Sequence, residues 1–255
     1  MGGQAVSSFD LTGKAAIVTG ANTGIGRAIA MALAEAGADV ALAGRSRANE
    51  TAAQIAAAGR RTVLIEADLS TTAPVQQVVD ETVGAFGRLD ILVNNAGIIR
   101  RAEATDFSEA DWDAVLDTNL KSLFFLCQAA GRHMLGQGAG KIVNIASLLS
   151  FQGGIRVPSY AAAKSGVAGL TKALANEWAG RGVNVNAIAP GYIATNNTAA
   201  LQADETRNRQ ILERIPAGRW GEPRDIAGAA VFLASPAADY VNGHVLAVDG
   251  GWLGR

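Results

Sequence analysis

A tyrosine and a lysine stand four residues apart in the stretch GGIRVPSYAAAK, residues 153–164. In a helix, this spacing places the side chains of Tyr160 and Lys164 on one face, close enough to interact. A free tyrosine has a pKa of ~10, and a neighbouring ammonium favours the phenolate and lowers that pKa. We therefore expect Tyr160 to act as an acid or base near neutral pH, with Lys164 as the cation that makes this possible.

Two polar residues upstream complete a candidate catalytic set. Ser147 ends the apolar run that begins at Gly140, where its hydroxyl could orient the same substrate oxygen as Tyr160. Asn119, in DTNLKS, could hold a water that links Lys164 to bulk solvent. The YxxxK spacing alone occurs by chance in many helices, so the indication of chemistry comes from the combination.

A glycine-rich turn, TGANTGIG, follows the first apolar run and precedes a helical pattern. Gly20 allows a tight turn, Gly24 lets the backbone approach a pyrophosphate, and Gly26 lets helix and strand pack closely. The following helix would offer free N–H groups to the anion. A purely structural turn is the alternative. We expect a dinucleotide to contact Gly20, Asn22, Thr23, Gly24, Ile25 and Gly26.

The residues after the second apolar run bear on the choice of dinucleotide. NAD sites place an acid there for the ribose 2′-hydroxyl, whereas NADP sites place an arginine near the 2′-phosphate. Here Gly44 stands in place of the acid and is followed by Arg45 and Arg47. This favours NADP or use of both cofactors, unless the arginines are solvated surface charges. Further expected contacts with the cofactor are Asp68, Leu69, Asn95, Ala96 and Gly97.

Short apolar runs alternate with alanine-rich helical patterns along nearly the whole chain. Such an alternation predicts a parallel sheet with helices on both faces. The expected strands begin at Ala15, Asp39, Arg61, Asp90, Gly140, Val183 and His244. The expected helices include 25–36, 74–86 and 161–179. We predict one α/β domain over residues 1–255, a Rossmann-type doubly wound parallel sheet of about seven strands.

A polar segment, residues 191–222, interrupts this alternation before the last strand and carries a helical pattern around 205–215. Ligands of such sheets bind beyond the carboxyl ends of the strands. The segment is therefore expected to be a substrate lid, with a variable surface excursion as the alternative.

Composition excludes several other classes of protein. The net charge of −1 gives no general attraction to nucleic acid or to anionic membranes. Cys127 is the only cysteine, which excludes an internal disulfide and metal sites built on thiolates, and we expect no metal. No apolar stretch approaches the ~20 residues that span a bilayer, and the N-terminal segment lacks the pattern of a secretory signal. A cytoplasmic protein is expected.

The motifs TGxxxGxG, NNAG and YxxxK, with Asn119 and Ser147 in order between them, resemble those of the short-chain dehydrogenase/reductase family over essentially the whole chain. The resemblance implies a seven-stranded Rossmann-type fold, a nicotinamide cofactor, a homotetramer, and catalytic roles for Asn119, Ser147, Tyr160 and Lys164. It also implies that Tyr160 and Lys164 contact the cofactor, as do Pro190, Gly191, Ile193 and Thr195. Residues 241–251 resemble the C-terminal strand and subunit interface of that family.

Four further segments, at 147–166, 191–201, 214–223 and 239–253, resemble a narrower branch, the 2-dehydro-3-deoxy-D-gluconate 5-dehydrogenases, also named 2-deoxy-D-gluconate 3-dehydrogenases. This resemblance implies a deoxy keto sugar acid as substrate and a preference for NAD. The Gly44–Arg45 pair departs from that preference, so the cofactor is left as NAD or NADP.

A sugar acid brings a carboxylate, which an arginine can grip with two hydrogen bonds. Arg156 is the first candidate because it lies closest in sequence to Tyr160, with a loop ion pair as its alternative. The others are Arg100, Arg101, Arg214 and Arg219. Gln152, Asn196 and Asn197 could bond sugar hydroxyls or simply form turns, and Trp220 could cap the lid or pack.

The sequence as a whole favours reversible hydride transfer between a nicotinamide and a secondary alcohol or ketone of a sugar acid. Two alternatives stay open. One is a related reductase of another carbonyl, such as a 3-oxoacyl thioester or another sugar. The other is a non-catalytic nucleotide-sensing scaffold, against which the complete set of Ser147, Tyr160 and Lys164 argues.

Overall fold

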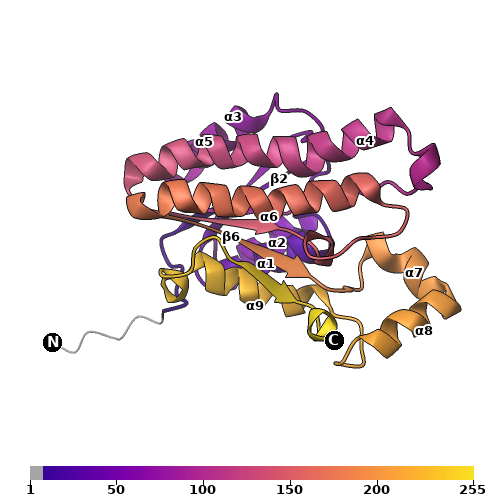
Figure 1. Ribbon diagram of the computed structural model, residues 1–255. Helices are drawn as coiled ribbons and strands as arrows, with labels where there is room; N and C mark the ends of the chain where they lie inside the picture. The colour runs from indigo at the N-terminus through magenta and orange to yellow at the C-terminus, as the bar shows by residue number, and fades with distance from the viewer. Residues whose placement is uncertain (1–7) are drawn as a thin grey trace.

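A seven-stranded parallel sheet forms the centre of the computed structural model, which describes residues 8–255 (Figure 1). The expectation about a secretory signal rests partly on residues 1–7, which lie outside the described residues. The strand order is β3-β2-β1-β4-β5-β6-β7, and every neighbouring pair is parallel. The strands are β1 Ala15–Thr19, β2 Asp39–Gly44, β3 Thr62–Glu66, β4 Ile91–Asn94, β5 Gly140–Ile145, β6 Val183–Pro190 and β7 Val245–Val248.

Apolar residues on both faces of the strands explain why the sheet is buried in the middle of the molecule. All residues of β1, β4 and β6 are buried, as expected for parallel strands covered by helices on each side. The chain runs outward in one direction from β1 to β3 and returns to add β4 on the other side of β1. The carboxyl ends of β1 and β4 therefore flank the point where ligands of doubly wound sheets bind.

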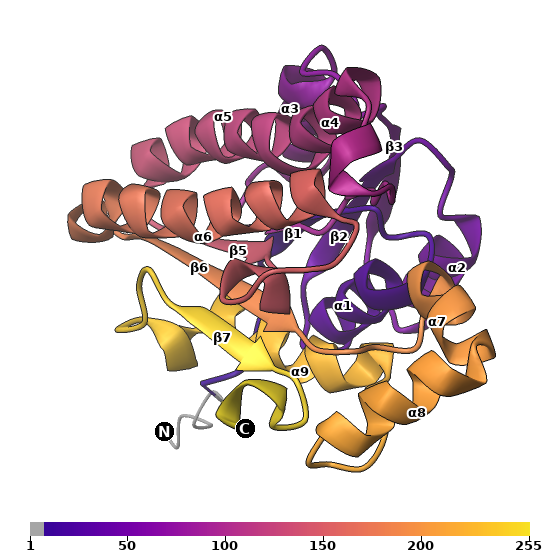
Figure 2. The same cartoon turned by 45° about the vertical axis from the view of Figure 1, so that its right-hand side comes forward.

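Helices cover the two faces of the sheet in two layers (Figures 1 and 2). One apolar core packs α3, α5 and α6 against one face, and a second packs α1, α2 and α9 against the other. The helices are α1 Gly24–Glu35, α2 Asn49–Ala57, α3 Val75–Phe86, α4 Glu109–Leu116, α5 Ser122–Gln137, α6 Pro158–Trp178, α7 Ala199–Ala203, α8 Glu205–Arg214 and α9 Pro223–Ala234. Among the described residues, no helix combines the length and apolar character needed to cross a membrane.

The segment that interrupts the alternation, residues 191–222, extends beyond the carboxyl edge of the sheet and contains α7 and α8 (Figure 2). A bridge between Ile193 and Gly221 closes its base. A third, small apolar cluster combines Ile211 and Ile215 of this segment with Leu148 and Trp252. The segment is thus packed against the rest of the chain by its own core.

The structure confirms the predicted fold class, a single Rossmann-type α/β domain with seven parallel strands. Each strand begins within one residue of its predicted start. One feature was not predicted: residues Asp117–Lys121 form a π-helical turn between α4 and α5, and this turn carries Asn119.

Candidate active site

Ser147, Tyr160 and Lys164 meet beyond the carboxyl end of β5. Tyr160 lies in the first turn of α6, which Pro158 begins, and shares a hydrogen bond with Ser147. The Ser147 hydroxyl also accepts a hydrogen bond from the Leu149 backbone at 3.2 Å, which fixes its orientation. Lys164 lies one turn further along α6, and its Nζ is 5.6 Å from the centroid of the Tyr160 ring. The predicted serine, tyrosine and lysine are therefore brought together.

The protonation of Tyr160 differs from the sequence-based expectation. Burial is the largest influence on its hydroxyl and raises the pKa above the ordinary value. The hydrogen bond from Ser147 and the positive charge of Arg101 act in the opposite direction. Ser147 and Arg101 are thus the groups of the described chain that lower this pKa, and the predicted contribution of Lys164 together with an oxidised nicotinamide stays a prediction.

Lys164 is directed toward the backbone of β5 instead. Its side chain is buried, and its Nζ donates a 2.5 Å hydrogen bond to the carbonyl of Ile145. Burial disfavours the ammonium and lowers the pKa of Lys164 to about 8. Below that pH most of the lysine carries its charge, so Lys164 supplies a cation beside Tyr160 at neutral pH.

Asn119 has a structural contact that the sequence did not predict. Its side chain is fully buried; its Oδ1 accepts from the Ile98 amide and its Nδ2 donates to the Ile98 carbonyl, both at 2.8 Å. These two bonds clamp the loop that follows β4, next to Gly97. The predicted role in a proton relay stays a prediction, and the observed role of the side chain is to position this loop.

The glycine turn after β1 has the geometry of an anion cradle. Gly20 and Gly24 have φ values of 66° and 55°, a region that favours glycine. A Cβ on Gly26 would lie 2.3 Å from the Gly20 carbonyl oxygen, so only glycine fits there. The first turn of α1 carries no acidic residue, which leaves its N-terminus suited to a phosphate. Ile25, Asn22 and Thr23 lie in the same turn, as expected.

NNAG holds this turn in place from the neighbouring strand. Asn95 Nδ2 donates to the carbonyls of Thr19 and Gly20, at 2.9 and 3.2 Å. In return, the Thr19 hydroxyl accepts from the amides of Asn95 and Ala96, at 3.0 and 2.9 Å. Thr19 was missed by the sequence analysis, although its place at the end of β1 was a usable signal. These bonds lock the two loops that flank the binding edge.

The residues that bear on cofactor choice lie together at the ends of β2 and β3. The charge of Arg45 reaches Asp68, whose pKa is lowered mainly by hydrogen bonds from Ser70 and to a lesser degree by Arg45. Arg47 pairs with Glu66 at 3.8 Å, whereas no carboxylate within residues 8–255 forms an ion pair with Arg45. Leu69 is buried beside Asp68. An exposed, unpaired arginine next to Gly44 fits a ribose 2′-phosphate.

The segment after β6 approaches the same edge. Pro190 ends β6, and the amide of Gly191 bonds the carbonyl of Val248 at 2.9 Å. Ile193 is buried, and the methyl of Thr195 lies 3.4 Å from where a Cβ on Gly24 would be. Thr195 thus stands directly over the glycine turn. The glycine cradle, the acid-free helix end and unpaired Arg45 together fit a nicotinamide dinucleotide.

The five arginines proposed for a substrate carboxylate have different partners. Arg156 is exposed, has a left-handed φ of 63°, and pairs with Glu103 at 3.1 Å. This ion pair is the alternative that the sequence analysis left open. Arg100 pairs with Asp111, and Arg219 with Asp225. Arg101 forms no ion pair with any carboxylate of the described chain, and its charge reaches Tyr160.

The remaining predicted substrate residues lie in residues 191–222 or contact the cluster that packs against that segment. Gln152 Oε1 accepts from Trp252 at 3.2 Å and lies 3.5 Å from Arg214, whose guanidinium stacks 4.0 Å above Trp252. Asn196 and Asn197 are exposed, and the Asn197 carbonyl lies 3.5 Å from an Nη of Arg101. Trp220 donates to Asn208 and packs edge-on against Tyr192.

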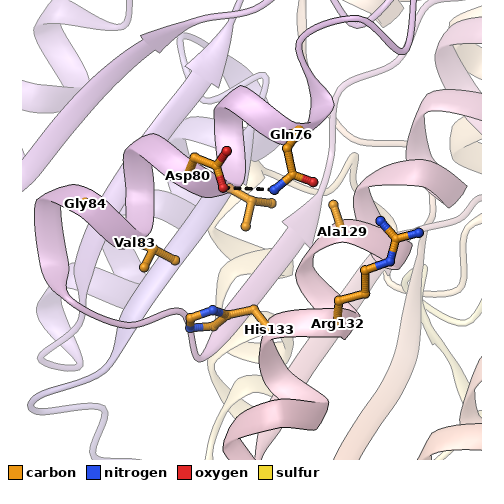
Figure 3. A pocket seen from close by; sticks show the side chains of 8 residues that line it. Gln76, Asp80, Val83, Gly84, Ala129, Arg132 and His133 are labelled. Atoms are coloured by element: carbon orange, nitrogen blue, oxygen red, sulfur yellow. Dashed lines mark hydrogen bonds between the residues drawn. The ribbon is translucent and has the colours of Figure 1, made fainter.

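A groove of about 530 Å³ lies between α3 and α5, away from these residues (Figure 3). It is lined by Gln76, Val79, Asp80, Val83, Gly84, Ala129, Arg132 and His133. Of the residues predicted to act in catalysis or binding, none lines it, so the candidate active site is the carboxyl edge of the sheet.

Comparison with known proteins agrees with this assignment. The profile of a family described as enoyl-(acyl carrier protein) reductase matches residues 20–253. Curated dehydrogenases match nearly the full length of the chain at more than half identity. The chain belongs to the short-chain dehydrogenase/reductase family. It is an NAD(P)-dependent oxidoreductase that acts on a CH–OH group.

Three relatives illustrate the similarity. The 2-dehydro-3-deoxy-D-gluconate 5-dehydrogenase of Escherichia coli is 57% identical, over 98% of this chain and 99% of its own length. A structure from Agrobacterium tumefaciens, provisionally named a 2-deoxy-D-gluconate 3-dehydrogenase and containing NADP, is 62% identical with a TM-score of 0.92, over 98% of this chain and 100% of its own. The gluconate 5-dehydrogenase of Burkholderia cenocepacia with NADP and tartrate is 40% identical with a TM-score of 0.93, over 99% and 100%.

Proposed function

We propose that this enzyme is a sugar-acid dehydrogenase that interconverts a secondary alcohol and a ketone on a deoxy keto-hexonate, of the 2-dehydro-3-deoxy-D-gluconate 5-dehydrogenase type. The observation that carries the proposal is the meeting of Ser147, Tyr160 and Lys164 with an unpaired arginine, Arg101, whose charge reaches the tyrosine. The relative from Escherichia coli, at 57% identity over almost the entire chain, supports the substrate class.

Each residue of the site has a separate part in the proposed reaction. Tyr160 gives a proton to the substrate oxygen during reduction and takes it back during oxidation. Ser147 holds that oxygen through its hydroxyl, and Arg101 pairs with the substrate carboxylate and favours the phenolate. Lys164 contributes positive charge and contacts the cofactor. Asn119 holds the loop beneath it and belongs to the proposed proton relay.

The cofactor is proposed to be NADP, with NAD use as the remaining alternative. When bound, the nicotinamide gives or accepts the hydride. Gly20, Gly24 and the first turn of α1 would hold the pyrophosphate, and Arg45 the 2′-phosphate. Two relatives whose structures contain NADP support this choice.

The proposed assembly is a homotetramer, and the proposed location is the cytoplasm. An apolar groove of about 370 Å³ between the π-helical turn, α5 and α6 supports burial against a second copy. Its lining includes Leu116, Leu120, Phe124 and Leu170. Residues 191–222 are proposed to close over the substrate as a lid.

Initial rates test the function most directly. The enzyme is assayed with 2-dehydro-3-deoxy-D-gluconate and 2-deoxy-D-gluconate, each with NAD and NADP. We expect turnover of one of these sugar acids, and a fall of kcat by about 10²–10⁴-fold in Tyr160→Phe, because that variant loses the acid/base but keeps the ring. The cofactor Kd should stay within about two-fold. Tyr240→Phe, at a fully exposed tyrosine, serves as the matched control.

The other outcomes each exclude part of the proposal. More than a tenth of the wild-type kcat in Tyr160→Phe would exclude the proposed acid/base. Turnover of a 3-oxoacyl thioester or a neutral sugar in place of both acids would identify a related reductase. Cofactor binding without turnover of any carbonyl would leave a nucleotide-sensing scaffold.

A further inference from the structure

A buried network of polar side chains, Asn94, Cys127, Asn144 and Thr171, runs through the apolar core beneath the active site. Asn94 Nδ2 donates to Asn144 Oδ1 at 3.0 Å and lies 3.2 Å from Cys127 Sγ. Asn144 Nδ2 donates to Thr171 Oγ1 at 3.1 Å, and the Thr171 hydroxyl donates to the Val167 carbonyl at 2.8 Å. The network therefore joins β4, α5, β5 and α6.

This network is costly to bury. Asn144, Cys127 and Thr171 are fully buried, and Asn94 is 3% exposed with its Oδ1 lacking a partner. Each buried amide loses its hydration, and hydrogen bonds return that free energy only where the geometry is met. Apolar side chains of the same size would fill the space without that requirement. Polar networks of this kind restrict a core to one arrangement of its elements.

One of the elements that the network joins is α6, the helix that carries Tyr160 and Lys164. Asn144 precedes Ile145, whose carbonyl accepts the hydrogen bond from Lys164. Thr171 follows Lys164 by two helical turns, so both side chains lie on the side of α6 that faces β5. Two bonds thus cross from β5 to α6, one at Lys164 and one at Thr171.

We propose that Thr171, held by Asn144, is a positioning residue that fixes α6 against β5 so that Lys164 and Tyr160 face Ser147. This inference rests on the proposed function for the roles of Lys164 and Tyr160.

The first turns of α6 are also tied to the loop after β5, since Ser150 donates to the Lys164 carbonyl and Ser165 donates to the Leu149 carbonyl. Further along α6, only apolar packing and the Thr171 bond hold the described helix to the sheet. The Thr171 bond is directional, so it resists sliding and rotation of the helix in a way that apolar packing does not.

Thr171→Val tests the positioning role, because valine keeps the shape of threonine and removes the hydroxyl. A shift of α6 should lower kcat by about ten- to a hundred-fold with the cofactor Kd within about two-fold of wild type. Thr171→Ser keeps the hydroxyl and should return kcat to within about three-fold of wild type.

Thr82→Val is the matched control. Thr82 is also fully buried in a helix and also donates to the carbonyl four residues before it, at 2.7 Å. It lies on α3, and its hydroxyl has no hydrogen bond to a strand of the described chain. Thr82→Val should lower the free energy of unfolding no more than Thr171→Val does, because no buried amide loses its partner, and it should keep the wild-type kcat.

A readout without turnover separates this inference from the proposed function. The pKa of Lys164 can be followed by NMR in selectively labelled enzyme. It should be about 8 in the wild type and higher in Thr171→Val, because the ammonium becomes more exposed. A folded Thr171→Val with an unchanged Lys164 titration would overturn the inference, whatever the substrate is. Equal losses of kcat in Thr171→Val and Thr82→Val would also overturn it. Absence of turnover in the wild type would overturn only the proposed function.

Discussion

Arg101 and Arg156 lie in loops that are hydrogen-bonded to each other, since the amide of Ala102 donates to the carbonyl of Arg156. Their charges are compensated differently. Arg156 faces Glu103, and both members of that pair are largely exposed. Arg101 influences Tyr160 and has no acidic partner in residues 8–255. A carboxylate brought in by a substrate would therefore find its counter-charge at Arg101.

Arginine-to-alanine variants at these two positions should behave differently. Arg101→Ala should raise KM for carboxylated sugars by roughly ten- to a hundred-fold, the value of a charge-assisted hydrogen bond. Arg156→Ala should stay within about two-fold, because an exposed ion pair contributes little. Initial rates with a carboxylated sugar and a neutral ketone measure the difference. An equal rise of KM for both substrates in Arg101→Ala would show that the arginine has no carboxylate to bind, whereas an equal fall of kcat reports only its effect on Tyr160.

Sequence alone predicted that Ser147, Tyr160 and Lys164 would meet, because their spacing on one helix and one strand end is local. It did not identify the partners of these residues. Which charge reaches Tyr160 depends on the loop after β4, and the partner of Asn119 depends on how the π-helical turn packs against that loop. Both are contacts between segments that are distant in sequence, and residue types and spacing do not predict such contacts.

At the scale of elements, the proposed lid, residues 191–222, shares an apolar cluster with the loop that follows Ser147. Leu148 directly follows Ser147 and packs in the same cluster as Ile211 and Trp252. Tyr192 lies between two tryptophans, with its ring centroid 5.5 Å from Trp220 and 4.6 Å from Trp252. Weaker packing in this cluster should therefore alter the position of residues 191–222 and the orientation of Ser147.

Trp252→Ala should raise KM for the substrate by about ten-fold or more and lower kcat, because remote packing holds the site in its working geometry. Trp178→Ala is the contrasting variant, since Trp178 packs in the large core beneath α6. It should lose about 3–5 kcal/mol of unfolding free energy, whereas Trp252→Ala should lose less. Thermal unfolding and limited proteolysis of residues 191–222 measure the two effects. If Trp252→Ala leaves KM and the proteolysis of residues 191–222 unchanged, this apolar cluster has no part in substrate binding.

The starts of the strands were predicted to within one residue, because buried parallel strands are short apolar runs with clear beginnings. The π-helical turn was not predicted, since an i to i+5 turn has no sequence period of its own and is set by tertiary packing. The helices of the lid were predicted only around 205–215, where the pattern is regular.

At the scale of the molecule, two surface grooves differ in chemistry. The groove between α3 and α5 carries Gln76, Asp80, Arg132 and His133 (Figure 3). The groove beside α6 is mainly leucine and phenylalanine, and the exposed ring of Phe125 stands beside it, in edge contact with Phe124. Apolar surface of this kind is favoured at interfaces between subunits.

Phe125→Glu should therefore reduce the proposed tetramer to a smaller species, because a carboxylate cannot be buried in that interface without a partner. Gly84→Glu places the same charge in the groove between α3 and α5, where a Cβ at position 84 would meet no atom within 4 Å, and should leave assembly unchanged. Sedimentation velocity at several protein concentrations measures both. If Gly84→Glu dissociates the assembly and Phe125→Glu does not, the subunit interface lies at the groove between α3 and α5 instead.

The end of the described chain has a practical consequence for handling the enzyme. Trp252 is buried in the lid cluster, and Arg255 donates to the carbonyl of Glu213 on α8 at 2.8 Å. An affinity tag fused directly after Arg255 would disturb this contact with α8, which belongs to the segment proposed to close over the substrate. A tag at the N-terminal end of the sequence avoids this contact, so kinetic constants are best measured on protein tagged there.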